Sequence, residues 1–162
     1  MKKTVLILLA LPFLCQVSMA QATGEREMKL ISSFSSSQGY TVVEITGEVL
    51  KGMSDRLGSI ASQLDRISIA TTENIVNIER MKSQVADLLY ASDLNYNVIV
   101  SDSEGNREVK VATRKLGGAN SKKNCYLIFS SEPTQGVLVI VMGSVDIKSL
   151  TGFASQFGVT IK

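Results

Sequence analysis

Two nearly uninterrupted apolar runs, Cys125–Ser130 and Val137–Met142, restrict the folds open to this chain more than any other feature. Each run has the length of a strand, and a strand without polar alternation is usually covered on both faces of its sheet. The connection between the runs contains EPTQG, whose proline and glycine suit a short hairpin turn. We therefore predict two adjacent antiparallel strands that lie centrally in a sheet, beneath helices.

Two further strands are predicted before this pair, over Tyr96–Ser101 and Glu108–Leu116. The segments DSEGN and GGANSKK follow them and carry the glycine and polar turn formers that hairpin connections require. Four consecutive strands with short connections form an antiparallel meander. The second half of the chain is therefore predicted to be a four-strand meander.

The first half is predicted to add two strands and two helical segments. EREMKLISSFSSSQG has apolar residues at helical spacing and ends at Gly39, whereas YTVVEIT and RISIATT are rich in β-branched residues that favour strands. Apolar residues between the two strands recur at helical intervals, and they are Val49, Met53, Leu57 and Ile60. This spacing predicts a helix, which Gly52 and Gly58 weaken.

The clearest helix is predicted between Glu73 and Tyr90, behind a cap at Thr71 and Thr72 and with an acidic first turn. Its apolar stripe consists of Ile75, Ile78, Met81, Val85, Leu88 and Leu89. Such a stripe is typical of a helix that packs on a sheet.

A closing helix is expected to begin at Asp146, which can cap it, and to end at Gly158. Its inward residues would be Ile147, Leu150, Phe153 and Phe157. The sum of these elements is one α+β domain over residues 21–162. Its sheet is largely antiparallel, with the C-terminal meander plus two N-terminal strands, and its helices pack mainly on one face.

The first twenty residues have the three-part layout of a secretory signal peptide, with two lysines, an apolar run and a polar end. The run is too short to span a bilayer, so no permanent transmembrane anchor is expected. Ser18 and Ala20 are the small residues that signal peptidase accepts, which predicts cleavage between Ala20 and Gln21. Bulky residues precede Cys15, so we expect no lipid there and a protein exported to the periplasm or beyond.

Charge and residue types exclude several function classes. Loss of the two leader lysines leaves 15 basic and 15 acidic residues, so nucleic-acid binding through phosphate neutralisation is not expected. The chain has no histidine, which removes serine and cysteine triads and histidine-rich zinc sites. Motifs of serine acyltransferases, of hydrolases with a G-x-S-x-G turn and of phosphate-binding loops are also absent from the sequence. No catalytic, cofactor-binding or metal-binding residue is singled out, and no cofactor is expected.

Two segments have residue patterns that resemble binding sites. Asp102, Glu104 and Asn106 alternate as calcium ligands do, but Arg107 and Thr113 stand where an EF-hand needs glycine and glutamate, so a hairpin turn is the better interpretation. The region from 107 to 123 holds six basic residues against one acid. Alternation along its strand predicts an outer basic face formed by Lys110, Arg114, Lys122 and Lys123. This face is either a solvated surface that protects the sheet or a site for an anionic ligand or partner.

Cys125 is the cysteine that remains after export, and it opens an apolar run. A buried structural thiol is the favoured interpretation, with intermolecular pairing or thiol reactivity as the alternatives.

The order of the motifs YTVVEITGEVLKGM, YNVIVSDSEGNREVKVATRK and VLVIVMGSVDIKSL resembles a family of small secreted Bacteroidetes proteins, the domain-of-unknown-function family 4252. The resemblance implies an envelope or extracellular protein without an assigned activity. We therefore expect a non-enzymatic module that binds an unknown envelope protein or an anionic ligand. The alternative is a carboxylate-dependent hydrolase that acts on glycan or peptidoglycan, which a deep cleft with two facing acids would favour.

Overall fold

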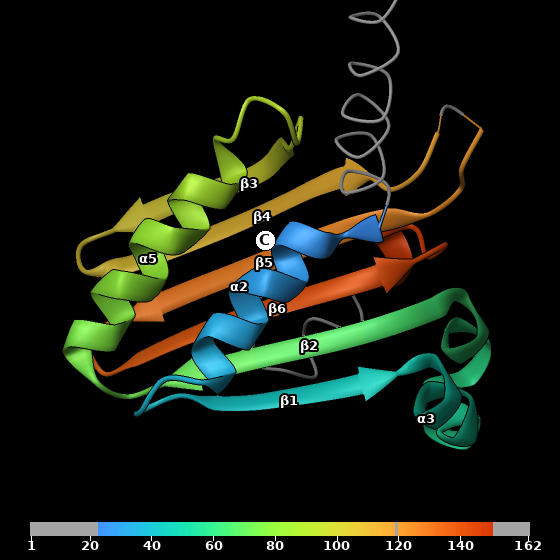
Figure 1. Ribbon diagram of the computed structural model, residues 1–162, viewed down its shortest axis with the longest axis horizontal. Helices are drawn as coiled ribbons and strands as arrows, with labels where there is room; N and C mark the ends of the chain where they lie inside the picture. Colours follow the sequence, from blue (N-terminus) through green and yellow to red (C-terminus); the bar gives the residue numbers. More distant parts are fainter. Residues whose placement is uncertain (1–22, 119, 151–162) are drawn as a thin grey trace, which may run out of the picture.

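The structure is a computed structural model that describes residues 23–118 and 120–150. These residues form one six-stranded antiparallel sheet with strand order β1-β2-β6-β5-β4-β3 (Figure 1). The strands are β1 (Thr41–Thr46), β2 (Leu64–Thr72), β3 (Asn97–Glu104), β4 (Arg107–Lys115), β5 (Asn124–Glu132) and β6 (Gln135–Gly143). The predicted α+β fold is confirmed, with β3 to β6 as the C-terminal meander and β1 and β2 as the N-terminal strands.

The two apolar runs, Cys125–Ser130 and Val137–Met142, form β5 and β6, which occupy the two central positions of the sheet. Side chains on both faces of β5 are buried, since Leu127 and Phe129 belong to one hydrophobic cluster and Tyr126 and Ile128 to the other. Cys125, on the same face as Leu127, is also buried. The prediction of a central strand pair covered on both faces is therefore confirmed.

Two long helices, α2 (Glu25–Ser35) and α5 (Ile75–Leu89), lie across one face of the sheet (Figure 1). They bury an apolar stripe against that face, which includes Ile31 and Phe34 of α2 and Met81 and Val85 of α5. This arrangement agrees with the prediction that the helices pack mainly on one face.

The opposite face has its own hydrophobic cluster, to which Leu50, Val111 and Val141 belong. Three short helical segments contribute to it in place of the predicted single helix, namely α3 (Gly47–Gly52), α4 (Ser54–Leu57) and η1 (Gly58–Gln63). The break between α4 and η1 follows from Gly58, whose φ of 60° lies in the left-handed region that ends a right-handed helix. Sequence periodicity alone had joined these segments into one helix.

The start of α5 differs from its prediction in two ways. The cap is Asn74, whose side-chain oxygen accepts hydrogen bonds from the amides of Val76 and Asn77, rather than the threonine pair. The first turn consequently contains no acid. Ile75 was predicted to face the core, yet 64% of it is exposed, because the first turn projects beyond the edge of the hydrophobic cluster.

The end of the described chain agrees with the predicted closing helix as far as it can be followed. Residues 147–150 are helical, and the Asp146 carboxylate accepts a hydrogen bond from the Ser149 amide at 2.8 Å. Phe153, Phe157 and Gly158 lie outside the described residues, as does the predicted leader with its cleavage site between Ala20 and Gln21. Among the helices described, none has the length and apolar character needed to cross a membrane.

Candidate functional site

The four residues predicted to form a basic face differ in their exposure and in their partners. Lys122 and Lys123 are exposed in the connection between β4 and β5, whereas Lys110 lies within β4 and pairs with Glu108 at 2.7 Å. Arg114 is buried, with only 4% of its surface exposed, so the prediction that it lies on an outer face is wrong. The face of β4 that carries Lys110, Ala112 and Arg114 is the face covered by the helices.

Arg114 is held by Glu27, which projects from the first turn of α2 and is itself fully buried. The guanidinium donates to both carboxylate oxygens, from Nε at 2.6 Å and from Nη2 at 2.8 Å. The Tyr96 hydroxyl donates to the same carboxylate at 2.6 Å, and it lies 3.6 Å from the Cys125 thiol. We call these four side chains the Glu27 cluster, and it ties α2 to the start of β3, to β4 and to β5.

The electrostatics of the Glu27 cluster are those of a structural clamp. Burial by itself would raise the pKa of Glu27, but the hydrogen bonds from Arg114 and Tyr96 and the arginine charge together lower it below its ordinary value. Burial raises the pKa of Cys125 to about 12, and the nearby Glu27 charge acts in the same direction. The thiol is therefore protonated at neutral pH and is not a nucleophile. The prediction of a buried structural cysteine is confirmed.

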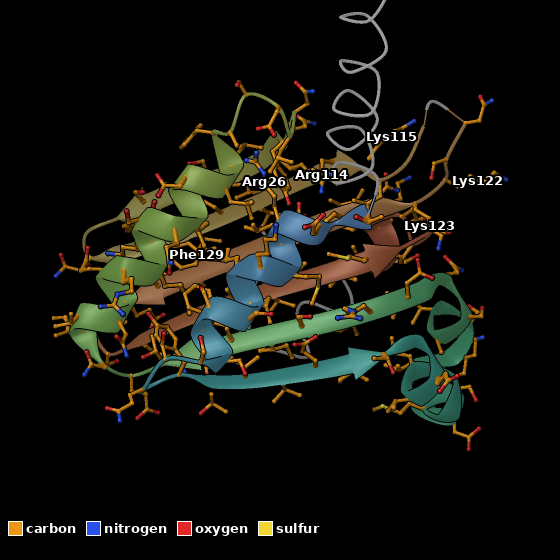
Figure 2. The ribbon with its side chains drawn as sticks, in the orientation of Figure 1. Arg26, Arg114, Lys115, Lys122, Lys123 and Phe129 are labelled. Atoms are coloured by element: carbon orange, nitrogen blue, oxygen red, sulfur yellow. The ribbon has the colours of Figure 1, made fainter. Side chains whose placement is uncertain are left out.

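Lys122 and Lys123, the exposed members of the predicted basic face, form a lysine cluster at one end of the sheet together with Lys115, which lies outside the predicted set (Figure 2). Lys123 pairs with Asp65 at 2.8 Å, and both side chains are about half exposed. The connection from Leu116 to Asn124 contains no acidic residue. Of the predicted basic face, only Lys122 and Lys123 belong to this lysine cluster.

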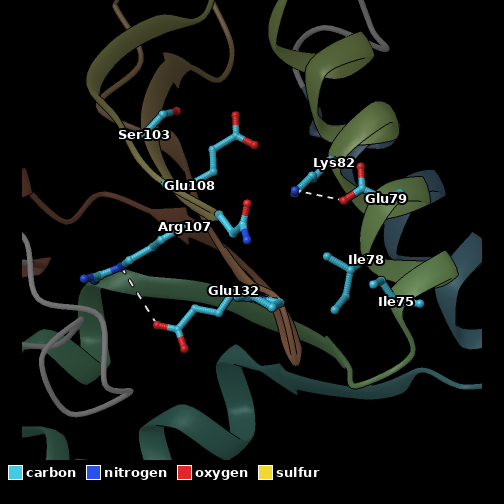
Figure 3. Close-up of a pocket in the computed structure, with 11 residues that line it drawn as sticks. Ile75, Ile78, Glu79, Lys82, Ser103, Arg107, Glu108 and Glu132 are labelled. Atoms are coloured by element: carbon cyan, nitrogen blue, oxygen red, sulfur yellow. Dashed lines mark hydrogen bonds and ion pairs between the residues drawn. The ribbon is translucent and has the colours of Figure 1, made fainter.

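A cleft of about 360 Å³ lies at the opposite end of β4 from the lysine cluster, between the first half of α5 and two hairpin turns (Figure 3). The β3–β4 turn contributes Gly105 and Asn106, and the β5–β6 turn contributes Pro133. Both turns meet there because alternate connections of a meander lie at the same end of its sheet. The predicted hairpin interpretation of DSEGN is confirmed, with Gly105 at a φ of 60°.

The cleft combines an apolar wall with charges of both signs. Ile75 and Ile78 of α5 form part of the wall, and its charged residues are Glu79, Lys82, Arg107, Glu108 and Glu132. Each acid has a cation beside it. Glu79 contacts Lys82 at 2.9 Å, Glu132 contacts Arg107 at 3.9 Å, and Glu108 contacts Lys110. The cleft therefore presents charges of both signs next to aliphatic side chains.

Sequence reasoning did not identify this cleft, although one signal pointed to it. The meander predicted that DSEGN and EPTQG would lie at one end of the sheet, and both turns are flanked by charged residues. The missing information was the position of α5 over that end. Within residues 23–118 and 120–150, no group of three potential metal ligands comes together. Asp102 and Glu104 lie in β3, and the turn that follows them lines the cleft through Gly105 and Asn106.

Comparison with family models gives one match, over residues 34–153, to a family described as a domain of unknown function, DUF4252. The match contains the sheet, α5 and the whole cleft, but it begins within α2 after Glu27. A comparison with curated proteins finds no match.

Proposed function

The chain belongs to the DUF4252 family, whose description assigns no activity, and we propose that it is an exported binding protein and not an enzyme. We place it in the periplasm or outside the cell, in the envelope of a Gram-negative bacterium such as a member of the Bacteroidetes. Support for export comes from the layout of residues 1–20 and from the small residues before Gln21. The bulk before Cys15 supports export without a lipid anchor.

The cleft between α5 and the hairpin turns is the observation that carries the proposal. Its volume lies within the range of small-ligand sites, and its polar groups converge next to aliphatic side chains. Ile75 and Val76 are 64% and 66% exposed at the start of α5, where they extend the apolar surface. Exposed aliphatic residues beside fixed charges are typical of a surface that binds another molecule.

The ligand class that fits this cleft is a short peptide segment. An apolar side chain of the ligand would pack against Ile75 and Ile78, while neighbouring charges of the ligand would meet Lys82, Arg107 or Glu132. Such pairs at a partly exposed rim act mainly on specificity and on the association rate. A partner protein of the envelope would supply this segment.

The carboxylates of the cleft favour binding over the alternative of a hydrolase. A carboxylate-dependent hydrolase needs one acid that holds a proton and a second that does not. Here Glu79, Glu108 and Glu132 each lie beside a lysine or an arginine, which is an arrangement for neutralising charge. We therefore assign these residues to ligand binding.

The lysine cluster supports a second contact, with an anionic part of the same or another partner. The connection from Leu116 to Asn124 contains no acid, Lys115 and Lys122 are exposed, and Lys123 pairs with Asp65. Exposed like charges attract anions over roughly 10 Å at 0.1 M salt. Arg114 and Lys110 take no part in it, because both lie on the helix-covered face.

Selection from a random peptide library displayed on phage tests the proposed function. Wild-type protein and the control Lys51→Glu, whose exposed side chain lies outside the cleft, should enrich a common motif with an apolar residue flanked by charges. The double variant Lys82→Glu with Arg107→Glu should lose that motif while it still unfolds cooperatively. Failure of the wild type to enrich any motif, or enrichment of the same motif by the folded double variant, would refute peptide binding in the cleft.

A further inference from the structure

The outer edge of β1 is open to pairing with another strand. β1 is an end strand of the sheet, and no described element lies beyond it (Figure 1). Its pairing with β2 runs without a bulge from Thr41 to Thr46, and its six residues include neither proline nor lysine. Bulges, prolines and charged side chains are devices by which natural sheets protect their edges. β1 has no bulge and no proline, and Glu44 is its one charged residue.

The other edge of the same sheet is protected. The pairing of β3 with β4 shifts between Val98 and Val100, which leaves Ile99 as an extra residue in a bulge. The far half of β3 carries Asp102 and Glu104. Because a bulge twists an edge and like charges repel a second copy, β3 is a poor partner for another strand.

We propose that β1 pairs antiparallel with β1 of a second copy of this chain, about a twofold axis that passes beside Val43. The axis stands perpendicular to the sheet, so each face of one copy continues into the same face of the other. The two sheets then form one continuous sheet across the dimer. This arrangement is an isologous interface, the commonest kind in homodimers.

The register follows from the side chains of β1. Residues that lie opposite each other in an antiparallel pair point to the same face, so a twofold axis near the centre of β1 can pass beside Val43 or beside Glu44. The Glu44 register would place two carboxylates directly opposite each other, which is destabilising. The Val43 register places Val43 against its own copy and Glu44 opposite Val42, so only this register suits a dimer.

The surface at this edge is suited to burial. Val43 is 46% exposed, which is high for an aliphatic strand residue, and a second β1 would cover it. The Glu44 carboxylate is paired with Arg66 of β2 at 2.9 Å, so charge at the edge is compensated within each copy. The inference does not rest on the proposed function, because the cleft lies between α5 and the meander, away from β1.

Sedimentation velocity of the exported protein over a range of concentrations tests the proposal first. The wild type should dimerise, and Val43→Lys should raise the dissociation constant by about tenfold or more, since two lysines would then face each other. The matched control is Val98→Lys on the β3 edge, where the valine is 37% exposed, and it should dimerise like the wild type. A wild type that stays monomeric, or a folded Val43→Lys variant that dimerises normally, would overturn the proposal.

Cysteine scanning then tests the register. Under mild oxidation Val43→Cys should form a disulfide-linked dimer, because residues 43 of the two copies lie directly opposite each other. Thr41→Cys should not, since Thr41 lies opposite Ile45 in this register. The native Cys125 is buried and leaves the readout to the introduced thiol. Equal cross-linking at positions 41 and 43 would contradict the twofold axis at Val43.

Discussion

Replacing Glu27 by alanine is expected to lower the free energy of unfolding by about 3–5 kcal/mol, because one member of a buried ion pair is then removed. Both partners are almost completely inaccessible, at 0% exposure for Glu27 and 4% for Arg114. The carboxylate accepts three hydrogen bonds, two from Arg114 and one from Tyr96. Its loss removes the carboxylate that lies against the buried guanidinium of Arg114, and this is the main source of the cost.

Urea unfolding followed by circular dichroism measures this change through a shift in the midpoint at constant slope. For a chain of this length the same loss should lower the melting temperature by about 10 °C. Glu25→Ala is the matched control, since Glu25 lies in the same turn of α2 and pairs with the exposed Lys29. It should cost no more than about 0.5 kcal/mol.

A double replacement separates the cost of a broken pair from the value of the pair itself. Glu27→Leu combined with Arg114→Met removes both charges and keeps apolar volume, so it should recover most of the stability lost in either single variant. The clamp interpretation is wrong if Glu27→Ala costs no more than Glu25→Ala. It is also wrong if the two single replacements are additive in the double variant, because residues in contact should couple.

The same cluster predicts how stability depends on pH. The pKa of Glu27 is lower in the folded protein than its ordinary value of 4.5, despite burial, because Arg114 and Tyr96 stabilise the carboxylate. Folding therefore favours the ionised form, so the contribution is present above the unfolded pKa and is lost as the pH falls through the folded pKa. Below pH 4.5 the wild type should lose stability more steeply than Glu27→Gln in the same urea assay. Parallel pH profiles for the two proteins would contradict this assignment.

Four further predictions concern single features of the chain. Cys125→Ala should lower the free energy of unfolding by about 1 kcal/mol or somewhat more, because the side chain is buried. In the wild type this thiol should react only slowly with a labelling reagent, because it is buried and its pKa is raised to about 12. Asn74→Ala should cost about 1 kcal/mol in urea unfolding, since two amides of α5 lose their cap. N-terminal sequencing and intact mass of the protein from its native host should give a start at Gln21 without lipid. The double variant Lys122→Glu with Lys123→Glu should keep the melting temperature of the wild type but bind a polyanionic column more weakly.

Local patterns predicted the sheet well because its strands carry strong and independent signals. The unbroken apolar runs of β5 and β6 left no option but the centre of a sheet, and glycine-containing connections ordered the meander. The core stripe of α5 from Ile78 to Leu89 was also correct. Ile75 was predicted to be buried and is exposed. Helical periodicity tells which side of α5 a residue faces, but it does not tell where the sheet beneath the helix ends.

The prediction for Arg114 failed for a related reason. Alternation along β4 separates the residues into two sets but does not tell which set lies beneath helices. Ala112 and Leu116 share the face of Arg114 and are apolar, and this signal could have indicated that the face is buried. The partner, Glu27, is 87 residues away in the sequence. A long-range pair of this kind is fixed by the packing of α2 on the sheet and leaves no local pattern.

Nuclear magnetic resonance titration of the labelled protein with a peptide selected on the wild type tests the central claim, that the cleft is a binding site. Changes in amide chemical shift should concentrate in the first half of α5, around Ile78 and Lys82, and at the hairpin ends around Asn106 and Glu132. The peptide should bind the folded Lys82→Glu/Arg107→Glu variant at least about tenfold more weakly than the wild type. Shifts confined to the lysine cluster at Lys122 and Lys123, or equal affinity for the variant, would contradict the claim and place binding at the other end of the sheet.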